Sequence, residues 1–219
     1  YLAYTNQAEA EHILLHEGTH QFVHMAMDFP IPSAYRRYFV AEMDSLFCVP
    51  IWLNEGLATY VESSRFENGK LFVGGINNDR LRHLQKLIED GKAPSLEDLF
   101  RVEQKDFTVE YYAVAWGIVY WFLKDPVPAE AKRRRKVLKS YVDACKKGFF
   151  DNPEADFSKR FNPDGKGLNK DFIQQWRQYA KDEGLATFLR LTIGEKVSMD
   201  KWQSRWLEWI KARKADEKM

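Results

Sequence analysis

Five consecutive residues near the start of the chain, His16-Glu17-Gly18-Thr19-His20, form an H-E-x-x-H sequence. If this segment is helical, the two imidazoles lie one turn apart on the same face, close enough to bind a single metal ion. Glu17 lies next to that face, where its carboxylate can reach a metal-bound water. The motif therefore predicts two zinc ligands and a general base.

A zinc site of this kind needs a third protein ligand, and the nearest candidates are His12 and His24. They extend the two motif histidines into an unbroken i, i+4 series. Each such step drifts by about 40° around a helix, so the outer histidines point away from the central pair. Three ligands from one straight helix also cannot close around a tetrahedral ion without distortion. We therefore expect His12 and His24 to be neighbours of the site rather than ligands.

The other candidate is Glu55, which lies in the segment W-L-N-E-G-L-A-T-Y-V-E at residues 52–62. This segment resembles the W-L-N-E-G-x-A-x-Y-x-E signature of gluzincin metallopeptidases, the thermolysin-like and M1 aminopeptidase-like group. The order H-E-G-T-H-Q followed by P-x-W-L-N-E-G-L-A is more closely similar to the DUF1570 or peptidase-MA-like families. The resemblance extends over residues 10–125.

The resemblance implies that His16, His20 and Glu55 are the metal ligands, that the cofactor is Zn²⁺, and that Glu17 is the general base. Glu55 would lie on a second helix packed against the H-E-x-x-H helix. The implied activity is hydrolysis of a peptide or protein substrate by a metal-activated water. Glu17 would take the proton of that water and pass it to the leaving amine.

The family also places a tyrosine on a later helix, where its hydroxyl hydrogen-bonds the developing oxyanion. Tyr112 is our choice for this second catalytic residue, and Tyr111 is the close alternative. Thr59 and Glu62 lie one and two turns beyond the third ligand on the same helical face. They are candidate partners for the ligating histidines, or ordinary polar residues of that helix.

The H-E-x-x-H motif lies in a predicted helix over residues 5–28. Asn6 followed by Glu9 gives a start that resembles a capping box, and Pro30 and Pro32 end the helix. Residues 33–49 are interpreted as a short helix and a connection.

The second ligand helix is predicted from Ile51 to about Phe66. Leu71-Phe72-Val73, followed by two glycines, is the best strand or hairpin candidate. Three more helices are predicted: 79–90, a short one capped by Ser95, and 108–124. The last is nearly all apolar and aromatic, which predicts a buried helix at the centre of the domain.

The predicted fold class is mainly α: a zincin-like helical catalytic core with little β-structure and a helical C-terminal extension. We place the metallopeptidase core at residues 1–128 and the extension, packed on the core, at 129–219, with a loop at 151–168. Trp202, Trp206 and Trp209 form one apolar stripe, which favours intramolecular packing over a partner surface.

The charge balance argues against nucleic acid as a partner. Lys and Arg number 33, Asp and Glu number 32, and the formal net charge is +1. The basic run at residues 132–136 is typical of a solvated helical face. No apolar run approaches the ~20 residues that a membrane span needs. The oligomeric state is left open.

Three functions remain as hypotheses. The first is a zinc-dependent peptidase. The second is a zinc-binding but catalytically silent module that binds peptides or proteins, because the β-sheet that gluzincins place upstream of the motif is expected to be largely missing. The third is a helical interaction domain with an incidental H-E-x-x-H. The spacing between His20 and Glu55 is longer than in M1 aminopeptidases, so their substrate mode is not expected here.

Overall fold

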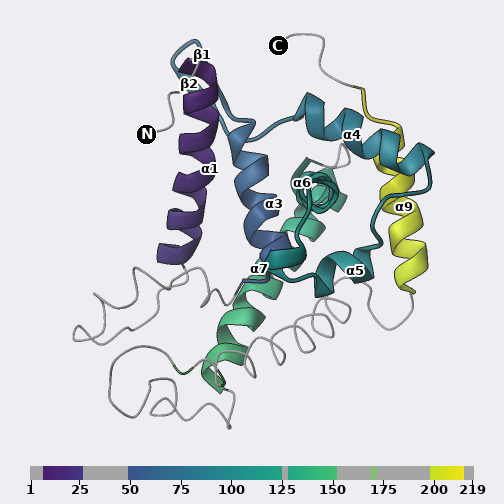
Figure 1. The fold of residues 1–219 in the computed structure, drawn as a ribbon. Helices are drawn as coiled ribbons and strands as arrows, with labels where there is room; N and C mark the ends of the chain where they lie inside the picture. The colour runs from purple at the N-terminus through teal and green to yellow at the C-terminus, as the bar shows by residue number, and fades with distance from the viewer. Residues whose placement is uncertain are drawn as a thin grey trace.

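The structure is a computed structural model that describes residues 7–26, 49–124, 128–151, 169, 171 and 198–214. Within these ranges the architecture is mainly α, as predicted, with one small two-stranded sheet (Figure 1). The helices are α1 (Gln7–Ala26), α3 (Ile51–Glu62), α4 (Asn78–Glu89), α5 (Leu96–Arg101), the 3-10 helix η3 (Gln104–Asp106), α6 (Val109–Lys124), α7 (Pro128–Asp151) and α9 (Met199–Lys211). The predicted short helix at 33–49 and loop at 151–168 lie outside the described residues, apart from the ends at 49 and 151.

Helix α6 forms the centre of the fold. Every residue from 113 to 122 is buried, because this helix is apolar or aromatic around its whole circumference. Figure 1 views α6 nearly along its axis, with α3, α4 and α9 around it. The prediction of a buried central helix over 108–124 is confirmed.

A glycine allows α3 and α6 to approach closely. A Cβ atom on Gly56 would lie 2.7 Å from the carbonyl oxygen of Ala115, closer than real side chains tolerate. The same side of α3 buries Trp52, whose ring lies 4.9 Å from that of Phe100. This contact fixes α3 against the core and so fixes the position of Glu55, the residue before the glycine.

The chain between α3 and α4 forms a hairpin of β1 (Arg65–Glu67) and β2 (Lys70–Phe72), paired antiparallel. Its two turn residues, Asn68 and Gly69, have φ values of 51° and 74°, as a two-residue turn of type I′ requires. The prediction that the second helix extends to Phe66 is therefore wrong, since α3 ends at Glu62. The Asn-Gly turn and the strand residues around it outweigh the helical pattern.

Helix α9 packs on the core through the predicted tryptophan stripe. Trp206 is fully buried, Trp202 is nearly so, and the ring of Trp209 lies 5.4 Å from that of Tyr120 on α6. The prediction of an intramolecular packing face is confirmed. The division into a core at 1–128 and an extension at 129–219 stays a prediction.

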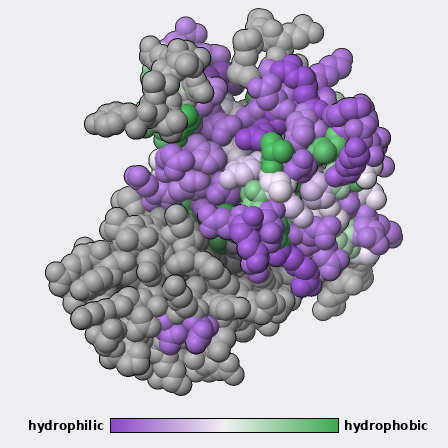
Figure 2. Space-filling model, in the orientation of Figure 1, coloured by the Kyte–Doolittle hydropathy of each residue, from purple (hydrophilic) through white to green (hydrophobic). Residues whose placement is uncertain are grey.

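The described surface on the face shown in Figure 2 is mainly hydrophilic, and apolar side chains are exposed there only in small separate areas. No helix in the described part of the chain combines the length and the apolar character needed to cross a bilayer. This agrees with the prediction of no membrane span.

Candidate metal centre

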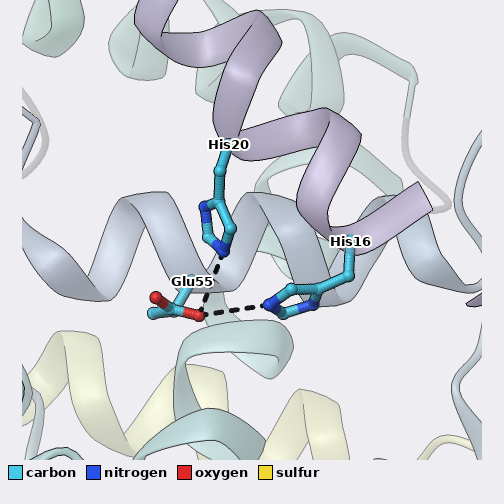
Figure 3. A group of neighbouring side chains, drawn as sticks. All are labelled: His16, His20 and Glu55. Atoms are coloured by element: carbon cyan, nitrogen blue, oxygen red, sulfur yellow. Dashed lines mark ion pairs between the residues drawn. The ribbon is translucent and has the colours of Figure 1, made fainter. Parts of the chain in front are cut away.

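Helices α1 and α3 pack side by side and bring the three predicted ligands together. His16 and His20 extend from α1, and both imidazoles point toward the carboxylate of Glu55 on α3 (Figure 3). The three ligand atoms lie within 4.8 Å of one another. The group could therefore hold a metal ion.

The separations within this group suit metal ligands better than hydrogen bonds. The Nε2 atoms of His16 and His20 lie 3.4 and 3.6 Å from the same oxygen, Oε2 of Glu55. A hydrogen bond between charged groups is shorter, about 2.7–2.9 Å. Two ligands that share a tetrahedral zinc at about 2.0–2.2 Å lie roughly 3.3–3.6 Å apart. The observed distances match this second geometry.

The third ligand carries a buried oxygen that the described residues do not satisfy. Glu55 is 6% exposed, and its Oε2 atom has no hydrogen-bond partner in the described part of the chain. A buried carboxylate oxygen without a partner is costly, because burial removes the water that would solvate its charge. A cation bound between the imidazoles would satisfy it, so the donor set fits a metal.

A second carboxylate orients one of the imidazoles. Nδ1 of His16 lies 3.0 Å from Oε2 of Glu62, one helical turn beyond Thr59 on α3. If Nδ1 donates to this carboxylate, Nε2 carries the free lone pair that faces Glu55, as a metal ligand requires. The side-chain amide of Asn77 in turn donates to Oε1 of Glu62 at 3.0 Å. His16 is thus held by a chain of two hydrogen bonds.

The same carboxylates control the charge of His16. Burial lowers its pKa, but the contacts of its ring with the Glu55 and Glu62 carboxylates and their negative charges together outweigh burial and raise the pKa to about 9. Without a bound cation, His16 is therefore protonated at neutral pH. A metal ion that binds here must displace this proton.

The predicted general base and oxyanion donor lie near this group. The pKa of Tyr112 is raised to about 12 by burial and by the negative charge of Glu55, with a further contribution from Glu17. The negative charges of both carboxylates thus act on the Tyr112 hydroxyl. The pKa of Tyr111, the alternative, is raised by burial and by the negative charges of Asp98 and Asp106, with no contribution from Glu55 or Glu17.

The remaining sequence candidates fall outside the ligand group. His12 is exposed and is not part of the cluster, in agreement with its interpretation as a neighbour. The side chain of His24 lies outside the described residues. The hydroxyl of Thr59 donates to the backbone carbonyl of Glu55 at 2.7 Å, so it supports the helix rather than an imidazole.

Two residues of this region, Asn77 and Arg80, were not predicted from the sequence. Asn77 caps α4 by accepting from the backbone N–H of Arg80 at 3.0 Å, and it also contacts Glu62. The guanidinium of Arg80 lies 5.4 Å from the ring centre of Tyr112. The helix start at Asn77 carries a capping signal in sequence, but nothing in that signal indicates proximity to the histidines.

Comparison with known proteins supports one of the families that the sequence resembles. Residues 42–147 match the model of a family described as "Protein of unknown function (DUF1570)". The matched stretch contains Glu55, Glu62 and Tyr112 and begins after the H-E-x-x-H helix. No curated protein and no solved structure matches the chain significantly.

Proposed function

We propose that this chain is a zinc-dependent peptidase. The observation that supports the proposal most is the convergence of His16 and His20 on one buried, otherwise unpartnered oxygen of Glu55. Two imidazoles and one carboxylate are the protein ligands of many catalytic zinc sites, which leave a fourth position open. The contact between Nδ1 of His16 and Glu62, which orients Nε2 toward Glu55, also supports this interpretation.

A zinc ion bound there would activate a water molecule and polarise the scissile carbonyl. Glu17 is exposed and adjacent to the first ligand, so its carboxylate can take a proton from the attacking water and deliver it to the leaving amine. Tyr112, with its pKa raised to about 12, keeps its proton at neutral pH and can donate a hydrogen bond to the developing oxyanion.

The test combines elemental analysis with hydrolysis of a peptide library. We expect about one zinc per chain, and loss of both zinc and activity in a Glu55→Ala variant. Glu17→Gln should retain zinc but lower kcat by roughly 10²–10⁴-fold, because it removes only the base. Glu11→Gln, an exposed carboxylate on the same helix, is the matched control and should change neither quantity.

Two results would count against the proposal. Stoichiometric zinc without hydrolysis of any peptide would support the catalytically silent binding module instead. A purified protein that holds no zinc, and whose melting temperature does not change when zinc is added, would support an interaction domain with an incidental motif.

A further inference from the structure

Arg80 is a cation beside the candidate metal centre that has no ion pair with any described carboxylate. It is half-buried near the start of α4, and no carboxylate among the described residues lies within 4.0 Å of its guanidinium. Its neighbour Arg82, by contrast, is paired with Asp79 at 2.9 Å. A half-buried guanidinium that no described carboxylate neutralises is a ready site for an external anion.

The position of Arg80 is tied to the metal centre by hydrogen bonds. Its backbone N–H donates to Asn77, Asn77 donates to Glu62, and Glu62 contacts Nδ1 of His16. The start of α4 is therefore held at a fixed place relative to α1 and α3.

The side chain of Arg80 extends toward the site. Its guanidinium lies 5.4 Å from the ring centre of Tyr112, whose ring also meets Phe107 edge-on at 4.8 Å. The charges of Glu55 and Glu17 act on the same tyrosine. Tyr112 thus lies in the field of the two site carboxylates and has a cation beside its ring.

We propose that Arg80 binds a carboxylate of the substrate and so directs the candidate peptidase toward peptides with an acidic group next to the scissile bond. This inference rests on the proposed function. A guanidinium suits a carboxylate because its N–H donors match the two oxygens of that group. The carboxylate could be the C-terminal group of a peptide or the side chain of an Asp or Glu.

The test uses the whole chain and four matched peptides. One pair differs only in a C-terminal carboxylate or amide, and the other only in an internal Glu or Gln. We expect kcat/KM to favour the carboxylate member of one pair by about 10-fold or more, and that pair identifies the source of the group. Arg80→Ala should abolish the preference and Arg80→Lys should keep only part of it, since an ammonium lacks the planar fork.

Arg82→Ala is the control, because Arg82 carries the same charge on the same helix but is exposed and paired. Its preference should equal that of the wild type. An equal loss of preference in this variant would overturn the proposal by showing a general charge effect. So would a uniform fall in kcat for all four peptides in Arg80→Ala with the preference intact, since Arg80 would then only position Tyr112.

Binding separates this proposal from the proposed function. The affinity of the zinc-free protein for the same peptides, measured by titration, should show the same carboxylate preference, and Arg80→Ala should lose it. This preference without hydrolysis of any peptide would refute the peptidase and retain the carboxylate site. Hydrolysis with no preference in either assay, or no binding of any of the peptides, would refute the carboxylate site.

Discussion

The two sides of α3 (Ile51–Glu62) are packed in opposite ways. Toward α6, the contact is apolar and close, with Gly56 against the backbone of Ala115. Toward α1, imidazoles meet carboxylates, and one buried oxygen of Glu55 has no hydrogen-bond partner among the described residues. The first side stabilises the fold by apolar packing, whereas the second is stable only with a positive charge between its carboxylates, either a protonated His16 or a bound cation. A site of this kind depends on a core that is stable without it.

Truncation of Trp52 is expected to have the largest effect on stability. Trp52 is 1% exposed on the apolar side of α3, and its ring contacts those of Phe100 and Tyr141. Trp52→Ala should lower the free energy of unfolding by about 3–5 kcal/mol. Urea unfolding should give the same loss with and without zinc, because Trp52 belongs to the apolar side alone. Phe66→Ala, at a residue that is 72% exposed, is the control and should change stability by less than about 0.5 kcal/mol.

Glycine-to-alanine substitutions compare the α3–α6 contact with the α1 side of the site. In Gly56→Ala the new Cβ would lie 2.7 Å from the carbonyl of Ala115, so α3 and α6 must separate, at a cost of about 1–3 kcal/mol. Gly18→Ala, on α1, meets no atom within 4 Å and should stabilise its helix by about 0.5–1 kcal/mol. Thermal unfolding of the zinc-free variants measures both changes. Equal effects would mean that α3 and α6 are not in close contact.

Glu62→Gln tests the charged side of α3, which faces α1. Asn77 uses its amide oxygen to cap α4, so its amide nitrogen must face Glu62. His16 and Asn77 contact different oxygens of Glu62, so a glutamine would place its –NH2 donor against one of these two donors. We expect zinc affinity to fall about 10–100-fold, as for other groups that orient a metal ligand. Competition with a chelating dye measures the affinity. Glu67→Gln, on the exposed hairpin, should leave it unchanged.

The prediction of secondary structure from the sequence was most accurate where one local signal decides the structure. The apolar run at 108–124 predicted the buried helix, and the tryptophan spacing predicted the packed face of α9. It was wrong at the end of α3, where a turn at Asn68 and Gly69 outweighs helical periodicity. A two-residue signal of this type is easily overlooked inside a longer pattern.

The candidate site was predictable only in part for a similar reason. The two histidines were predictable because H-E-x-x-H is a short motif that carries its own spacing, and Glu55 because the segment around it resembles a known family signature. Asn77 and Arg80 could not be found in this way, because their place near His16 and Tyr112 results from the packing of α4 on α6 and from hydrogen bonds across helices. Contacts of this kind leave no periodic pattern in the sequence.

Stability is also expected to depend on pH, and this dependence belongs to the charged side of α3 alone. The pKa of His16 in the folded, zinc-free protein is raised from 6.5 to about 9, so its protonated form stabilises the fold. This stabilisation is fully present below pH 6.5 and is lost as the pH rises toward 9. Urea unfolding of the zinc-free protein at pH 6.5 and 9.5 should therefore show a larger decrease than in His16→Asn, which removes the titrating group. Trp52→Ala should retain the full decrease, since it alters only the apolar side, and an identical pH response in His16→Asn and the wild type would contradict the assignment of this charge to the α1–α3 contact.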